Sequence, residues 1–210
     1  MNRDKNYWEE YYKKQNENLL PSLFAKYVMN NLAKPEYTLI ELGCGNGRDA
    51  LFFANEKLNV IAYDQCEDEI CFLQVKYAQL KNIQFKVGDF SELPDITRAN
   101  LIYSRFTLHS ISKEQEQKTL IWVYRNLTEG GYFCIEVRGK KNEIYKLGKK
   151  VENEEDSYIY NNHYRRFLNL DTICTDLKNT GFVIEFAAEK KGFAPFAGKD
   201  ETYIRIIAKK

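Results

Sequence analysis

Three glycines at every second position separate an apolar run from a helical pattern in "TLIELGCGNGRDALFFA", residues 38–54. Gly43, Gly45 and Gly47 remove side chains where a backbone must turn with positive φ or approach a ligand closely. A dinucleotide-binding turn has the spacing Gly-x-Gly-x-x-Gly and faces a pyrophosphate. Here Glu41 stands two residues before the first glycine, where a carboxylate would repel phosphate. The turn therefore predicts a ligand without phosphate at this point, and Glu41 predicts contact with loop amides or a cationic group.

Two further acids follow the next two apolar runs of the chain. Asp64 ends "NVIAYD", and Asp89 follows "IQFKVG". Ligands of open α/β sheets bind beyond the carboxyl ends of the parallel strands, where these acids would meet. A single acid at a strand end is more often a helix cap or a turn residue. Acids at the ends of three successive strands, together with the glycine turn, predict one ligand site.

The order of turn and acids resembles the class I S-adenosylmethionine-dependent methyltransferases, whose first motif is an acid followed by x-Gly-x-Gly-x-Gly. The resemblance implies S-adenosylmethionine as cofactor and S-adenosylhomocysteine as product. It also implies that Asp64 binds the ribose hydroxyls, Asp89 meets the adenine amino group and Phe90 lies beside the ring. The other cofactor contacts that it implies are Cys44, Gln65, Ser104 and Tyr12, the last of which has core packing with Trp8 as its alternative role.

The segments "YSRFTLHSI", "HYRRFL" and "GFVIEFAAEKKGFAPF" are similar to those of small bacterial methyltransferases associated with surface-polysaccharide biosynthesis. The first segment also resembles one in phosphoethanolamine methyltransferases, whose histidine supports catalysis, although Phe106 stands here in place of an acid. His109 and His163 are the only histidines in the chain. Because a histidine can accept a hydroxyl proton near neutral pH, His109 is the first candidate base and His163 its rival. A hydrogen-bonded or exposed histidine is the alternative for each.

Arginines near these histidines predict an anionic acceptor, because guanidinium groups bind carboxylates and phosphates through two parallel hydrogen bonds. Ion pairs with nearby acids are the alternative role for these arginines. No cluster of residues predicts a bound metal. The candidate acceptor-binding residues are Arg105, Arg138, Tyr164, Arg165 and Arg166.

The elements that must position these residues alternate between short apolar runs and helical patterns, which is typical of a parallel α/β sheet. Apolar runs at 37–42, 59–64, 83–89, 99–104 and 132–137 predict five strands, and runs at 182–189 and 202–208 predict an antiparallel hairpin at one end of the sheet. The fold class predicted is α/β: a Rossmann-like, seven-stranded, mostly parallel sheet with helices on both faces and a C-terminal antiparallel hairpin.

A chain of 210 residues predicts one domain, residues 1–210. Within it, residues 1–35 predict an N-terminal helical cover over the cofactor. Residues 139–166 are charged and rich in tyrosine without a clear apolar face, which predicts a substrate lid or a solvated loop.

The charge balance, 31 Lys and Arg against 30 Asp and Glu, gives no large basic field for a nucleic-acid partner. No apolar run reaches membrane-spanning length, and no secretion signal opens the chain, so we expect a cytoplasmic protein without a membrane partner. Five scattered cysteines argue against a disulfide framework and predict small buried apolar residues. The oligomeric state is not predicted.

These features predict a methyltransferase that acts on oxygen or nitrogen of a small, anionic acceptor, with a surface-polysaccharide precursor as one example. A methyltransferase acting on RNA or protein is the first alternative. A catalytically silent protein that binds S-adenosylmethionine is the second, since the same turn and acids serve binding alone. A nicotinamide-dependent dehydrogenase is the third.

Overall fold

The computed structural model describes residues 20–95 and 98–210, so Tyr12 and the first part of the predicted N-terminal cover lie outside the described residues. A seven-stranded sheet forms the centre of the described chain, and it is parallel except for the pairings of β10, as predicted. In spatial order its strands are β3 (Ile83–Val87), β2 (Asn59–Asp64), β1 (Thr38–Leu42), β4 (Ala99–Arg105), β5 (Leu127–Val137), β10 (Tyr203–Lys209) and β9 (Val183–Lys190).

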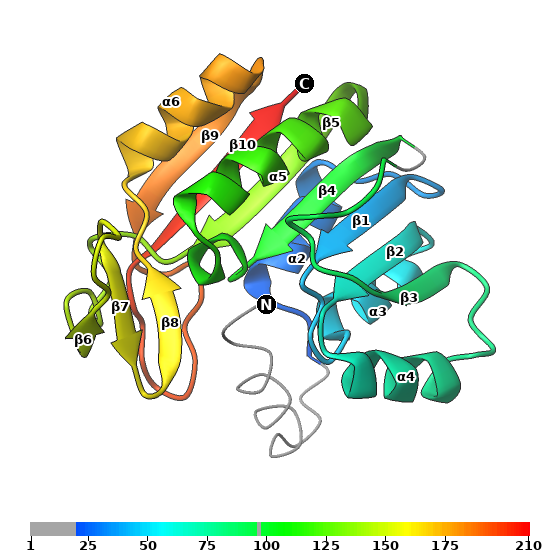
Figure 1. The fold of residues 1–210 in the computed structure, drawn as a ribbon. Coiled ribbons are helices and arrows are strands. Elements are labelled where there is room, and N and C mark those ends of the chain that lie inside the picture. Colours follow the sequence, from blue (N-terminus) through cyan, green and yellow to red (C-terminus); the bar gives the residue numbers. More distant parts are fainter. Residues whose placement is uncertain (1–19, 96–97) are drawn as a thin grey trace.

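Helices cover both faces of this sheet (Figure 1). One face carries α5 (Lys113–Asn126) and α6 (Leu170–Thr180), and the opposite face carries α2 (Leu23–Asn31) and α3 (Arg48–Asn55). The helix α4 (Glu67–Lys76) follows β2 and packs with β3. Strand order reverses between β1 and β4, so the carboxyl ends of these two strands border the position where open α/β sheets bind ligands.

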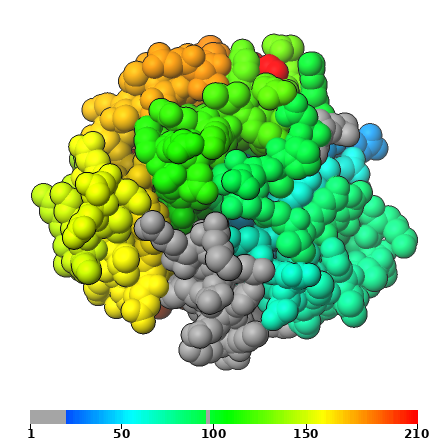
Figure 2. Space-filling view, in the orientation of Figure 1, coloured from blue at the N-terminus to red at the C-terminus, as the bar shows by residue number. Residues whose placement is uncertain are grey.

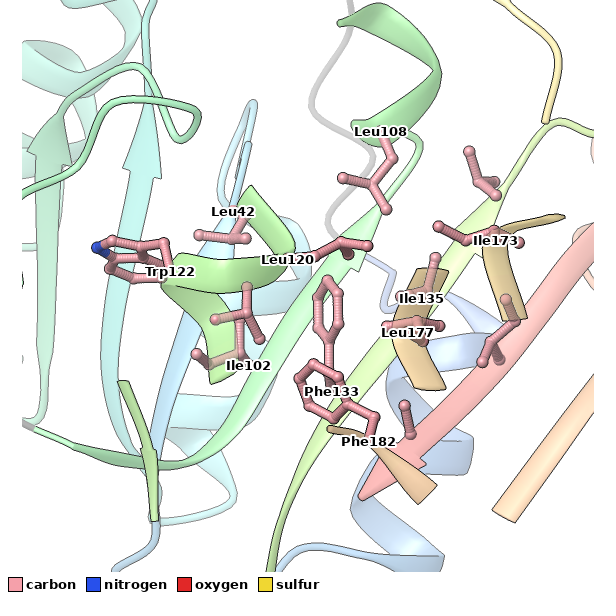
Figure 3. Packing of buried hydrophobic residues seen from close by; sticks show 14 of the residues in the cluster. Leu42, Ile102, Leu108, Leu120, Trp122, Phe133, Ile135, Ile173, Leu177 and Phe182 are labelled. Carbon is pink, nitrogen blue, oxygen red and sulfur yellow. The ribbon is translucent and has the colours of Figure 1, made fainter. Parts of the chain in front are cut away.

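Each face has its own apolar core, because residues along a buried strand point alternately to the two sides. On the side of α5 and α6, Leu120, Phe133 and Leu177 pack together with Ile102 and Ile135 (Figure 3). On the opposite side, the ring of Tyr103 packs against Phe24 of α2 and Phe53 of α3, with ring centroids 5.1 and 5.2 Å apart. The two cores hold the strand ends that carry the site.

Residues 149–166 form a second, three-stranded antiparallel sheet where the sequence predicted a lid or loop. Its strands are β6 (Lys149–Lys150), β7 (Ser157–Tyr160) and β8 (His163–Arg166). The rings of Tyr145, Tyr158 and Phe167 pack against one another, and Tyr158 belongs to β7. In the space-filling view this segment forms a lobe at one side of the molecule (Figure 2), and β8 packs against the short 3-10 helix η1 (Leu108–Ser110).

The helix α5 ends at Asn126, and Leu127 already has the extended backbone of β5. The prediction that the cysteines are buried is wrong in part. Two of the five cysteines are not buried: Cys71 is exposed on α4, and Cys174 is half-buried on α6. No helix within the two described ranges has the length and apolar content needed to cross a membrane.

Candidate cofactor and acceptor site

The glycine turn joins β1 to α3 through three residues with left-handed backbone. Gly43, Gly45 and Gly47 have φ values of 74°, 52° and 74°, a region that favours glycine because a Cβ would collide with the backbone. The amides of Gly43 and Cys44 both donate to the carbonyl of Tyr63, at 2.8 and 2.9 Å, which fixes the turn against the end of β2. The predicted turn is confirmed in its backbone conformation.

We expect the substitution Gly43→Ala to weaken S-adenosylhomocysteine binding at least tenfold. A methyl group at Gly43 would overlap the Cγ2 atom of Thr107, and the left-handed φ costs about 1–2 kcal/mol for a residue with a Cβ. Calorimetric titration measures the change. Gly130→Ala is the matched control, because Gly130 has the same φ of 74° with nothing within 4 Å of the added methyl. Adding Thr107→Ser to Gly43→Ala removes the overlapping methyl group and should restore part of the affinity. Unchanged affinity in Gly43→Ala alone would contradict the proposal that the turn cannot accept a Cβ at this position.

The two predicted acids lie at the ends of β2 and β3. Asp64 accepts hydrogen bonds from the amides of Gly45, at 2.9 Å, and Cys66, at 3.0 Å, so it ties the glycine turn to its own strand. Asp89 accepts from the amide and the hydroxyl of Ser91, at 2.9 and 2.7 Å. Each carboxylate keeps acceptor capacity beyond these bonds.

Other predicted cofactor contacts surround the turn. The Phe90 ring lies 3.9 Å from the position of a Cβ on Gly43, so this ring borders the turn. Gln65 is half-buried directly after β2, and Cys44 is buried within the turn. Ser104, at the end of β4, shares a 2.5 Å hydrogen bond with Thr107, whose methyl group faces Gly43. The structure thus gathers the predicted cofactor contacts of the described chain around one edge of the sheet.

Glu41 is almost fully buried beside the turn, with 4% of its surface exposed. Its Oε2 atom makes no hydrogen bond to any residue in the described ranges. Burial raises the pKa of Glu41 well above its ordinary value, and the negative charges of Asp49 and Asp64 add to this, while Arg48 and Arg105 oppose it. A buried carboxylate oxygen without a partner favours a cationic ligand.

Asp49, the second residue of α3, anchors α2 to the site, a role that the sequence analysis missed. Its carboxylate accepts from the amide and the hydroxyl of Ser22, both at 2.7 Å, and from the hydroxyl of Tyr103 at 2.9 Å. Ser22 also caps α2, since its hydroxyl accepts from the amide of Ala25. An acid at the start of a helix following the glycine turn was the only signal in the sequence.

His109 lies in η1, directly after the loop that touches Gly43. It is 3% exposed, and its Nδ1 atom is buried without a hydrogen bond to the described residues. Burial lowers the pKa of His109 well below its ordinary value, and the charges of Arg138 and Arg165 lower it further. Neutral His109 therefore has a free proton-accepting capacity at physiological pH. His163, the rival base, is buried at the start of β8. Its charge also lowers the pKa of His109.

Arginines and aromatic rings frame the same region. The guanidinium carbon of Arg105 lies 4.1 Å from the centroid of the Phe106 ring. The guanidinium carbon of Arg138 lies 5.9 Å from the same centroid. Phe106 adopts a left-handed φ of 60°, which turns the chain from β4 towards η1. The Nη1 atom of Arg138 donates to Asn142 at 2.8 Å and to Glu201 at 2.5 Å.

The three candidates from the small sheet occupy different surroundings. Arg166 is buried in an ion pair with Glu116 at 2.5 Å, and its Nε donates to the carbonyl of Ile111 at 3.1 Å, so it holds η1 against α5. The Tyr164 hydroxyl donates to Glu154 at 2.6 Å. Arg165 is half-buried and donates to the carbonyl of Tyr160 at 2.9 Å.

A second buried charge cluster escaped the sequence analysis. Glu136 of β5 accepts from the Nε atoms of Arg105 and Arg205, both at 3.0 Å. The guanidinium of Arg205 also stacks on Phe24 of α2, 4.7 Å from the ring centroid. One glutamate and one arginine inside otherwise apolar strand patterns were the signal that could have revealed it. No group of three or more residues in ranges 20–95 and 98–210 has the arrangement of a metal site.

Residues 33–191 match the family model described as "Methyltransferase domain", and the chain belongs to this family. An "Uncharacterized methyltransferase" of Staphylococcus carnosus is 24% identical over 164 residues, which span 74% of this chain and 77% of that protein. The fold resembles that of an S-adenosylmethionine-dependent methyltransferase of Methanosarcina mazei, with a TM-score of 0.75, 17% identity, and coverage of 87% of this chain and 96% of the other.

A third similar structure is the 1,6-didemethyltoxoflavin-N1-methyltransferase of Burkholderia thailandensis, with bound 1,6-didemethyltoxoflavin and S-adenosylhomocysteine. Its TM-score is 0.71 at 17% identity, covering 99% of this chain and 84% of the other. The described protein is therefore an S-adenosylmethionine-dependent methyltransferase with a Rossmann-like fold. The left-handed glycine turn, and the buried Glu41 oxygen that has no hydrogen-bond partner in the described ranges, fit this cofactor.

Proposed function

We propose that this enzyme methylates an oxygen or nitrogen atom of a small anionic acceptor, with His109 as the base. The observation that carries the proposal is a buried histidine, kept neutral by burial and by the charges of Arg138 and Arg165, one short loop away from the glycine turn. A neutral histidine accepts a proton, and neighbouring guanidinium groups attract an anion.

S-adenosylmethionine supplies an electrophilic methyl group on a sulfonium. In the proposed arrangement the glycine turn leaves room for the cofactor, Asp64 binds its ribose hydroxyls, and Asp89 with Phe90 binds its adenine. The acceptor atom forms a bond to the methyl carbon as the carbon–sulfur bond breaks, and His109 takes the proton of the attacking hydroxyl or amine. Holding the two reactants in line is the main contribution that the protein makes to such a transfer.

Arg138 and Arg165 are the proposed ligands of the acceptor's anionic group. Both act electrostatically on His109, which places their charges around the same region. Arg166 has a buried acid as its partner, so we assign it to holding η1 beneath the acceptor instead. Residues 139–166 are the proposed lid, and Tyr164 contributes to it through its bond to Glu154.

A small molecule is the proposed acceptor because of two observations. The chain has a net charge of +1 and hence no strong field for RNA, and the similar Burkholderia enzyme binds a small heterocycle. Sugar phosphates and nucleotide sugars, the precursors of surface polysaccharides, present the anionic groups that guanidinium groups bind. We place the reaction in the cytoplasm, where the exposed thiol of Cys71 would stay reduced.

Transfer of a labelled methyl group tests this proposal. The purified protein is incubated with S-adenosylmethionine labelled on its methyl group and with three separate pools: small molecules fractionated by anion exchange, total RNA, and protein. We expect label in an anionic small-molecule fraction. Label only in RNA or in protein would show that the acceptor class is wrong, and tight cofactor binding without any transfer would favour a silent binder.

A further inference from the structure

Charged residues form a row across one face of the main sheet, at the carboxyl ends of β1, β4 and β5 and near the amino end of the antiparallel β10. Glu41 of β1 is the register partner of Tyr103 in β4, and Arg105 lies two residues further along β4, on the same face. Arg105 is in turn the register partner of Glu136 in β5, which pairs with Arg205 of β10. The α2 and α3 helices cover this face of the sheet.

Within residues 20–95 and 98–210, Arg105 leaves most of its hydrogen-bonding capacity unused. Of the five N–H donors of a guanidinium, the described part of the chain engages only Nε, which donates to Glu136 at 3.0 Å. The side chain is 17% exposed, so part of it stays accessible. Its position is nevertheless fixed, because Glu136 holds it from one side and the ring of Phe106 lies 4.1 Å from its guanidinium carbon.

Hydrogen-bond donors of Arg105 remain for a further anion. Arg105 and Arg205 share the single carboxylate of Glu136. The charge of Asp49 also acts on Arg105, but the oxygens of Asp49 accept their hydrogen bonds from Ser22 and Tyr103. The terminal nitrogen atoms of Arg105 therefore keep donors that a bound carboxylate can accept from.

Glu41 presents the opposite charge on the neighbouring strand. With strands about 4.8 Å apart and residues spaced about 3.3 Å, the register places the Cα atoms of Glu41 and Arg105 roughly 8 Å from each other. The buried Oε2 atom of Glu41 lacks a partner in the described ranges, and the charges of Glu41 and Arg105 act on each other. A guanidinium with unused donors and a buried carboxyl oxygen without a partner in the described ranges thus lie beside the glycine turn, which matches the carboxylate and ammonium of an α-amino acid.

We propose that Arg105 binds the α-carboxylate of the amino acid part of S-adenosylmethionine and S-adenosylhomocysteine, with Glu41 facing the ammonium. This assigns Arg105 to the cofactor, whereas the sequence analysis placed it with the acceptor. Arg138 and Arg165 remain the proposed acceptor arginines, because both act electrostatically on His109 of η1 and Arg165 belongs to β8 of the small sheet.

Calorimetric titration with two ligands tests this role without any acceptor. One ligand is S-adenosylhomocysteine, and the other is the amine that remains when its carboxylate is removed. We expect Arg105→Gln to weaken S-adenosylhomocysteine binding about 10- to 100-fold, as for loss of a charged hydrogen bond. The same variant should bind the amine within about twofold of the wild-type protein, since that ligand has no carboxylate to lose.

Glu41→Gln is the matched control, because both ligands keep the ammonium and this variant should weaken both of them. Arg105→Lys keeps a positive charge beside Glu136 but loses the planar guanidinium that binds a carboxylate through two hydrogen bonds. It should therefore weaken binding of S-adenosylhomocysteine, though less than Arg105→Gln does, and leave binding of the amine unchanged. This variant keeps the test available if Arg105→Gln does not fold. Equal weakening of both ligands by the Arg105 variants, or no weakening of either, would overturn the proposal. The acceptor proposal fails separately, through the labelling experiment, because binding of these two ligands does not involve the acceptor.

Discussion

Replacing His109 with glutamine should lower kcat for the labelled acceptor by about 10²- to 10⁴-fold, the range for loss of a positioned general base. The reason is that His109 is the buried, neutral imidazole beside the turn, and glutamine keeps a polar group there without accepting a proton. Steady-state kinetics with the acceptor from the labelling experiment measure the change. The dissociation constant of S-adenosylhomocysteine should stay the same, because His109 lies outside the proposed cofactor contacts.

The pH profile of the wild-type enzyme provides an independent readout. A base must be neutral to act, and burial together with Arg138 and Arg165 lowers the pKa of His109. The ordinary pKa of a histidine is about 6.5. The acid limb of the kcat/KM profile should therefore lie below about pH 6.5. Activity should persist as the pH falls through 6.5 and decline only at the lower folded pKa. His163→Gln is the comparison variant: a full loss of kcat in it, with His109→Gln unaffected, would make His163 the base.

The glycine turn and the acids beside it were predictable because they are encoded in short, local patterns. The turn lies within one short segment that contains glycines 43, 45 and 47. Each acid lies at or near the end of one strand, and the parallel order of the strands brings these strand ends to one edge of the sheet. Local sequence determines backbone conformation at such turns through the lack of a Cβ. The hydrogen bond from the Gly45 amide to Asp64 shows how two of these patterns meet in space.

The charged partners were not predictable, because each pair joins residues far apart in the chain. Glu136 and Arg205 are 69 residues apart, and Arg166 and Glu116 are 50 apart. The periodicity of a strand shows that position 136 shares a face with position 134, but it does not show which strand lies next to it. The role of Arg166 depends on such a long-range pairing, so its residue type alone favoured anion binding.

The small sheet was missed for a different reason. Its strands contain two to four residues, and lysines, glutamates and tyrosines dominate the segment, so no alternation of apolar and polar residues is visible. Its apolar contacts come from the rings of Tyr145, Tyr158 and Phe167, which lie in three different segments: the turn before β6, the strand β7 and the loop after β8. The lid hypothesis for residues 139–166 stays a prediction, since the structure shows one arrangement of this segment.

The substitution Asp49→Ala should lower the free energy of unfolding by roughly 3–5 kcal/mol, because each orphaned buried donor costs about 1–3 kcal/mol. Asp49 accepts from the Ser22 amide, the Ser22 hydroxyl and the Tyr103 hydroxyl within the core between α2, α3 and β4. Alanine leaves the Ser22 amide and the Tyr103 hydroxyl without this acceptor. Urea denaturation followed by circular dichroism measures the loss, and a shift in the midpoint at constant slope identifies it as a change in stability.

Asp95→Ala is the matched control for this prediction. The carboxylate of Asp95, like that of Asp49, accepts from two other side chains, here Arg125 and Asn126, but Asp95 is exposed. It should cost less than about 1 kcal/mol, as exposed ion pairs do. Tyr103→Phe removes one of the donors that Asp49→Ala would orphan, so the double substitution should cost less than the sum of the two single ones. Strict additivity of the two, or equal losses in Asp49→Ala and Asp95→Ala, would mean that burial of this carboxylate does not control the docking of α2.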